Sequence, residues 1–259
     1  MLQWGGADNE VGVATTTSSR PARRLPWPVE FYRSAIGKKW VMGITGVLLL
    51  GFVLSHMIGN LKVYIGFLEE EGAYEIDLYG EALRSLLFPI IPKFWLLWVI
   101  RIGLIVAFAL HIHAAYALTV MNHRARPEGY QGPRQYLVAN YASRTMRWSG
   151  IIVLAYLLFH LADFTWGIQP FAPDTFVRGD IYRNFVDSFS RVPVAVLYIV
   201  ANLLLGVHIF HGAWSMFQSL GVNHPTFNCW RRWFAQAFAA VIVIGNVSFP
   251  VAVLTGIVK

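Results

Sequence analysis

Five long apolar segments alternate with polar stretches along the chain. They run from about Trp40 to Tyr64, from about Phe94 to Val120, from about Trp148 to Gly167, from about Val192 to Ser219, and from about Trp233 to Val258. Each is close to the ~20 residues that an α-helix needs to cross a hydrocarbon layer ~30 Å thick. The pattern therefore predicts an all-α protein, an integral membrane bundle of five transmembrane helices.

The composition agrees with this membrane assignment. Hydrophobic residues make up 56% of the 259 residues and charged residues only 14%, whereas soluble domains are roughly 45–50% apolar. Residues 1–29 are rich in Ser, Thr, Pro and Arg, and no apolar run follows a basic start. We therefore expect a flexible cytoplasmic N-terminal tail here, not a secretory signal. Residues 30–259 are expected to form the five-helix membrane domain.

Positive charge is unevenly divided between the two sides of the predicted bundle. Thirteen Lys and Arg residues fall in the N-terminal tail and the loops on its side, against seven in the opposite loops and at the C-terminus. The positive-inside rule then predicts a multi-pass protein of the cell membrane, with the N-terminus in the cytoplasm and the C-terminus outside. Because this rule accounts for the net charge of +7, we expect membrane lipid and no nucleic acid as a partner.

Four of the five segments carry a histidine near their middle, namely His56, His113, His160 and His208. A histidine in hydrocarbon is costly unless it has a partner, and two imidazoles from different helices of a bundle can hold a haem iron from both faces. For any one of these residues, a hydrogen-bonded structural histidine is the alternative. Four of them on four helices favour two haem b groups as cofactors, with one haem as the alternative.

The depth of each histidine indicates how they would pair. With a rise of ~1.5 Å per residue, His113 and His208 lie about 16 and 20 Å from the inner surface, and His56 and His160 about 25 and 20 Å. These depths favour an inner pair, His113 with His208, and an outer pair, His56 with His160. The depths of His160 and His208 overlap, so depth alone only leans toward this pairing.

Three residues near these positions have less certain roles. His211 follows His208 by three residues and shares nearly the same helix face, which makes it a rival ligand, a partner for a haem propionate or part of a quinone pocket. His111 lies about 200° around the helix from His113, so we expect it to face a different neighbour and to stay outside the ligand set. Arg101, near the outer end of its segment, either snorkels outward or pairs with a haem propionate.

The glycines and the single cysteine bear on what the histidines hold. Gly46 in the first segment, and Gly206 and Gly212 in the fourth, leave room either for a flat macrocycle or for close helix packing. Cys229 is the only cysteine, so the chain alone makes no internal disulfide and no four-cysteine cluster. A histidine-ligated iron–sulfur cluster of the Rieske type needs two cysteines as well, which ranks this alternative below haem.

Four motifs together resemble a known family. They are SAIGKKWVMGITG leading to HMIGN in the first segment, IHAAYA in the second, RWSGIIVLAYLLFHLAD in the third and HIFHGAWSMFQSLG in the fourth. With them, residues 30 to about 258 resemble the five-helix cytochrome b membrane anchor of succinate:quinone oxidoreductases and fumarate reductases (respiratory complex II), in the single-subunit, di-haem form. Matched helix by helix, the resemblance implies that the ligands are His56, His113, His160 and His208, with the second helix paired to the fourth and the first to the third.

The resemblance also implies a division of labour among subunits. A flavoprotein would oxidise succinate, an iron–sulfur protein would carry the electrons, and this chain would anchor both and pass electrons to menaquinone or ubiquinone in the membrane. The chain would then be the quinone-reactive subunit of succinate dehydrogenase. Succinate oxidation itself would lie on the partner subunits.

Quinone reduction takes up two protons, so its pocket needs a protonatable group near an interface. On the outer side the main candidate is Asp163, three residues after His160. On the inner side the candidates are Ser34, Lys38 and Trp148. An outer site would require electrons to cross the membrane through both haems, whereas an inner site would not.

Two other functions stay open at this point. The chain could be the haem b membrane anchor of another respiratory dehydrogenase, such as a hydrogenase or a formate dehydrogenase. It could also be a haem-free membrane anchor or small transporter in which the histidines are structural or relay protons. Copurification of a flavoprotein separates the first from the succinate dehydrogenase reading, and absence of a b-type absorption band would favour the second.

Overall fold

The computed structural model describes residues 25–125, 141–222 and 224–259. Its elements, in chain order, are α1 (Trp27–Arg33), α2 (Ala35–Asn60), the 3-10 helix η1 (Leu61–Tyr64), β1 (Phe67–Leu68), β2 (Ala73–Tyr74), α3 (Glu75–Arg84), α4 (Trp95–Ala125), α5 (Tyr141–His160), the π-helix η2 (Leu161–Trp166), α6 (Ile181–Ser190), α7 (Val192–Ser219) and α8 (Pro225–Leu254). The only sheet among these residues is the two-stranded hairpin of β1 and β2. The fold is therefore all-α, as predicted.

Five helices are long and apolar enough to cross a membrane, which confirms the predicted number of spans. They cover Ala35–Tyr64, Trp95–Ala125, Met146–Trp166, Val192–Ser219 and Asn228–Leu254. The fourth has the bounds expected from the sequence. The chain is thus a multi-pass membrane protein by the length and composition of its helices.

Helices α2, α5 and α8 begin earlier than hydrophobicity alone indicates, and local residues explain the start of α2 and of α8. The first begins at Ala35, because the side chain of Ser34 accepts a hydrogen bond from the backbone N–H of Gly37 and caps the helix there. The last begins at Pro225, a residue that is well placed in a first helical turn because its missing N–H would have no partner there anyway. Capping residues, and not the first apolar residue, set where these helices start.

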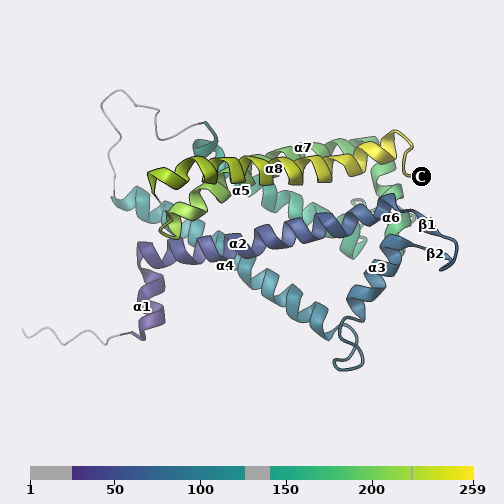
Figure 1. The fold of residues 1–259 in the computed structure, drawn as a ribbon, viewed down its shortest axis with the longest axis horizontal. Helices are drawn as coiled ribbons and strands as arrows, with labels where there is room; N and C mark the ends of the chain where they lie inside the picture. The colour runs from purple at the N-terminus through teal and green to yellow at the C-terminus, as the bar shows by residue number, and fades with distance from the viewer. Residues whose placement is uncertain (1–24, 126–140, 223) are drawn as a thin grey trace, which may run out of the picture.

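The start of the membrane domain also differs from expectation. Residues 1–24 of the predicted tail lie outside the described residues. The predicted tail ends at residue 29, but α1 already begins at Trp27, after Pro26. This short helix runs at a steep angle to α2 (Figure 1), and Trp27 on it is exposed.

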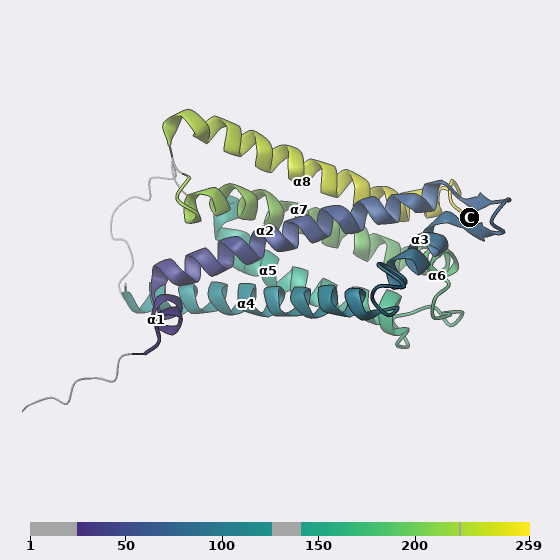
Figure 2. The ribbon, with the colours of Figure 1, turned by 60° about the horizontal axis from the view of Figure 1, so that its bottom comes forward.

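The long helices pack around α7. It contacts α8, α5 and α2, and α2 also packs against α4 and α8; α7 and α8 lie side by side in both ribbon views (Figures 1 and 2). The approach of α7 to α8 is close at Gly206, where a methyl group would collide with the side chain of Val243. Small residues at such contacts are how membrane helices gain packing energy. Of the two roles expected for Gly206, room for a macrocycle or close helix packing, the structure shows close helix packing.

One end of the bundle carries a cap formed by β1, β2, α3 and α6, close to the C-terminus (Figures 1 and 2). The carboxylate of Asp77 on α3 accepts hydrogen bonds from the backbone N–H groups of Ile181 (2.6 Å) and Tyr182 (3.1 Å), which begin α6. The hydroxyl of Tyr182 donates to the backbone carbonyl of Lys259 at 3.0 Å. The cap therefore joins the segment between the first and second spans, the segment between the third and fourth spans, and the C-terminal residue. Helix α1 lies at the opposite end of the bundle.

Candidate cofactor site

His56 on α2 and His160 at the end of α5 bring their imidazole rings together. The ring centroids are 5.9 Å apart and the ring planes are nearly perpendicular, at 82°. Metal–imidazole nitrogen bonds are ~2 Å long, so two imidazoles on opposite sides of one metal have centroids roughly 6 Å apart. The separation of this outer pair fits a shared iron.

The two rings of the outer pair differ in how firmly the chain holds them. His56 is exposed, stacks on Phe52 with ring centroids 5.4 Å apart, and has its Nε2 only 3.4 Å from Nδ2 of Asn60, a weak contact. His160 is half-buried and is surrounded by the rings of Tyr156, Phe164 and Tyr198. The packing around His160 fixes its ring more firmly than that of His56.

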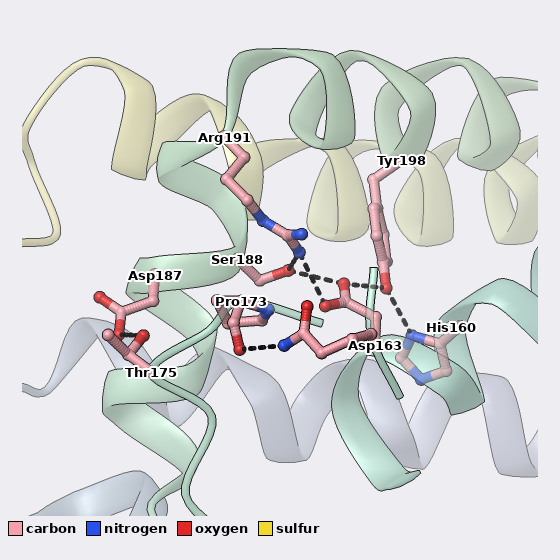
Figure 3. Close-up of polar contacts among 9 residues, drawn as sticks. His160, Asp163, Pro173, Thr175, Asp187, Ser188, Arg191 and Tyr198 are labelled. Carbon is pink, nitrogen blue, oxygen red and sulfur yellow. Dashed lines mark hydrogen bonds and ion pairs between the residues drawn. The ribbon is translucent and has the colours of Figure 1, made fainter. Parts of the chain in front are cut away.

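A hydrogen-bond chain reaches from His160 to Asp163 through the hydroxyl of Tyr198 (Figure 3). Nδ1 of His160 lies 3.4 Å from this hydroxyl, which itself donates to Oδ2 of Asp163 at 2.9 Å. Because an ionised carboxylate only accepts, the proton of Tyr198 points to Asp163 and its oxygen is left to accept Nδ1–H of His160. This arrangement leaves the Nε2 lone pair of His160 available to a metal.

Asp163 is the centre of a closed polar cluster. Ser188 donates to its Oδ2 at 2.6 Å, and the Arg191 guanidinium binds its Oδ1 at 2.9 Å. The side chain of Asp163 has no exposed surface, while that of Arg191 is 28% exposed. Figure 3 shows three donors converging on the carboxylate of Asp163. Ser188 comes from α6, Tyr198 comes from α7, and Arg191 directly precedes α7. With both oxygens engaged and no exposed surface, Asp163 is better placed to orient His160 than to touch a quinone.

The local backbone explains why these groups meet. Asp163 lies in the π-helical turn that follows His160, and such turns are frequent at functional sites. The turn ends at Gly167, whose left-handed φ of 65° suits glycine. Arg191 and Tyr198 are seven residues apart, two turns of α7, and therefore share one helix face.

His208 on α7 and His111 on α4 are held in the same manner. Nδ1 of His208 lies 3.2 Å from the hydroxyl of Ser149, and Nδ1 of His111 lies 3.2 Å from the hydroxyl of Thr45. Each of these hydroxyl residues is followed by a glycine that faces the imidazole: a methyl added at Gly150 would lie 3.5 Å from Cε1 of His208, and one at Gly46 would lie 3.6 Å from Cε1 of His111. Both α4 and α7 pack against α2.

His113 lies elsewhere, contrary to the expected inner pair. It is exposed, and its Nδ1 contacts the hydroxyl of Tyr32 on α1 at 2.5 Å. The two rings stack with centroids 5.7 Å apart. Positions 111 and 113 point about 200° apart around a helix, so only one of them can face the interior of the bundle. The structure has His111 half-buried against Thr45 of α2 and His113 exposed against Tyr32 of α1.

The remaining predicted residues are spread over the molecule. His211 is buried among Phe210 and Trp214, and its Nε2 has no hydrogen-bond partner among the described residues. Arg101 is exposed and its guanidinium lies 5.2 Å from the ring of Trp98, which fits a side chain that snorkels. Neither residue reaches the outer pair in this arrangement.

Two of the three inner quinone candidates are engaged by the chain's own backbone. Ser34 caps α2, and Lys38 donates to the backbone carbonyls of Tyr32 and Arg33, both at 2.9 Å. Trp148 is 69% exposed. Ser34 and Lys38 therefore stabilise the turn between α1 and α2, and this contact set offers nothing specific to a quinone.

Sequence reasoning missed the groups that support the histidines, namely Thr45, Ser149, Ser188, Arg191 and Tyr198. One signal was present: a hydroxyl inside an apolar segment and directly before a glycine, as in Thr45–Gly46 and Ser149–Gly150. In the described part of the chain, no three or more His, Cys, Asp or Glu side chains come together to hold a lone metal ion. The described residues bring together one pair of imidazoles, His56 with His160, and two axial ligands are what a haem iron held from both faces requires.

No family model matches the chain, and no curated protein or solved structure matches it either.

Proposed function

We propose that this chain is the cytochrome b membrane anchor of a succinate:quinone oxidoreductase, which carries electrons from an iron–sulfur subunit to quinone in the membrane. The observation that supports this most directly is the meeting of His56 and His160 from two different spans, with ring centroids 5.9 Å apart. Two haem b groups, menaquinone or ubiquinone as substrate, and flavoprotein and iron–sulfur subunits as partners belong to the same proposal.

The residues of this chain would bind and orient the cofactors. His56 and His160 would hold the outer haem, and His208 with a histidine of α4 would hold the inner one; bound haem would supply one-electron redox chemistry. The Tyr198–Asp163 chain would keep the His160 proton on Nδ1, so that Nε2 faces the metal. The surrounding aromatic rings would exclude water from the outer pair.

Charge supports a docking side for the partner subunits. The cytoplasmic side assigned by the positive-inside rule carries thirteen of the basic residues. A basic face of this kind steers and holds an acidic or polar partner. The proposed orientation therefore has the flavoprotein and iron–sulfur subunits in the cytoplasm, next to α1 and the N-terminus.

The test is to purify the complex from membranes and to count haem b per chain by its pyridine haemochrome. Wild-type complex should hold two haems and copurify with a flavoprotein. His56→Ala and His160→Ala should each remove one haem and slow succinate-dependent quinone reduction. His123→Ala is the matched control, because this histidine lies at the end of α4 against Arg147 and outside both pairs. A wild-type complex without a reduced-minus-oxidised b-type band would contradict the proposal.

A further inference from the structure

We infer that the inner haem is held by His111 and His208, each oriented through Nδ1 by a hydroxyl that directly precedes a glycine, and that His113 is not a ligand. This inference rests on the proposed function and concerns only which imidazoles form the inner pair. It replaces the ligand that the family resemblance assigns to the second span.

The two hydroxyl groups orient the imidazoles because their own protons are already committed. Thr45 donates to the backbone carbonyl of Val41 at 2.7 Å, and Ser149 donates to that of Met146 at 3.0 Å. A hydroxyl has one proton, so each oxygen is left as an acceptor toward the nearby Nδ1. Both histidines are therefore protonated on Nδ1 and carry a free lone pair on Nε2, the form that a metal ligand needs.

The glycines complete each support. Gly46 and Gly150 let the imidazole lie directly against the backbone of the neighbouring helix, at ordinary contact distance. His111 rests in this way on α2, and His208 rests on α5. The same three-part support therefore occurs twice, on two pairs of helices, and holds both rings at a defined height and rotation.

His113 has a hydroxyl at its Nδ1 but lacks the rest of this support, because none of the described glycines faces its ring. It is exposed, and its Nδ1 is occupied by the hydroxyl of Tyr32 from the short helix α1. His211 is the other rival, but it is one helical turn from His208, is buried, and has no hydroxyl orienting it among the described residues. Of His111, His113 and His211, only His111 is half-buried and also has a hydroxyl against its Nδ1.

The experiment compares substitutions two residues apart on one helix, in the purified complex, with haem b per chain as the readout. His111→Ala and His208→Ala should each lower the count from two to one, whereas His113→Ala and His211→Ala should leave it at two. A loss with His113→Ala or His211→Ala, and none with His111→Ala, overturns the inference while leaving the haem function intact. Absence of haem from the wild-type complex would instead defeat the proposed function.

A second pair of variants covers the case in which His111→Ala does not accumulate. Thr45→Val keeps the shape but removes the acceptor for Nδ1–H, so it should leave two haems and shift the midpoint potential of one of them to a more positive value, because a less basic imidazole stabilises ferric iron less. Thr119→Val is the control, since Thr119 donates only to the carbonyl of Ala115 within α4. Equal potentials in both variants and wild type would count against the support described for His111.

Discussion

Removing the Asp163 carboxylate should destabilise the protein strongly, although the residue lies in the short π-helical turn that ends the third span. In Asp163→Ala, the hydroxyls of Ser188 and Tyr198 lose their acceptor while remaining almost fully buried. An unsatisfied buried donor costs about 1–3 kcal/mol. Arg191 is 28% exposed, so water replaces part of its lost ion pair and its share must be discounted. The expected loss in the free energy of unfolding is about 3–5 kcal/mol, as for other broken buried pairs.

The assay is unfolding of the purified protein in a mild detergent, by heating or by titration with a denaturing detergent, followed by far-ultraviolet circular dichroism. Asp187→Ala is the matched control: Asp187 also accepts a hydroxyl, that of Thr175, and lies 3.7 Å from Arg183, but its side chain is 31% exposed and that of Arg183 is 56% exposed. Exposed pairs of this kind contribute about 0–1 kcal/mol. Equal losses in the two variants would refute the view that burial makes the Asp163 cluster important.

Three further predictions address other parts of the molecule. Tyr198→Phe should keep the outer haem but shift its midpoint potential, measured by redox titration of the b-type band, and an unchanged potential would show that the tyrosine hydroxyl does not act on the ligand. Gly206→Ala should lower thermal stability by about 1–3 kcal/mol, because the added methyl group collides with Val243 and overpacks the contact between α7 and α8. Gly212→Ala is the control and should lose little stability, because no atom lies within 4 Å of the added methyl group. Equal melting temperatures for the two variants would contradict this prediction. Desolvation raises the pKa of Asp77 above its ordinary value of 3.8 against two backbone hydrogen bonds, so the stability that this group contributes is present below that value and is lost as pH rises through the raised pKa. The difference in melting temperature between wild type and Asp77→Asn should therefore shift against wild type as the pH rises above the ordinary pKa of 3.8, and a pH-independent difference would disprove it.

Hydropathy was sufficient to predict the number of spans and the fold class. A run of apolar residues reports length and burial directly, and the fourth span has the predicted bounds for this reason. The starts of the first and last spans were placed too late, because Ser34 and Pro225 extend those helices past the apolar run. Local capping chemistry acts on one or two residues and does not change mean hydropathy.

The histidine pairs were only partly predictable. Depth along a helix follows from residue number, and it favoured the pairing of His56 with His160, which the structure brings together. The rotation of a helix about its own axis does not follow from residue number, and this rotation decides between His111 and His113. Contacts with Thr45 and Tyr32, which lie far away in sequence, settle it.

The Asp163 cluster could not be assembled from the sequence at all. Its members come from a π-helical turn, from α6 and from the start of α7, and their spacing follows no motif. Asp163 was noticed because it follows His160 by three residues, and proximity to a ligand suggested proton transfer. The donors that surround Asp163, Ser188 and Arg191, indicate instead that this carboxylate helps to hold the His160 ring in place.

The same cluster ties an extramembrane segment to the interior of the bundle. Ser188 and Arg191 belong to the segment between the third and fourth spans, on the face of the bundle near the C-terminus, yet their hydrogen bonds end one hydroxyl away from the His160 imidazole. A disturbance at that face, such as a loop substitution or a change of detergent or headgroup, therefore has a direct mechanical path to a ring deep in the third span. Mutational surveys that look only at the apolar helices would overlook the residues through which this ring is most easily displaced.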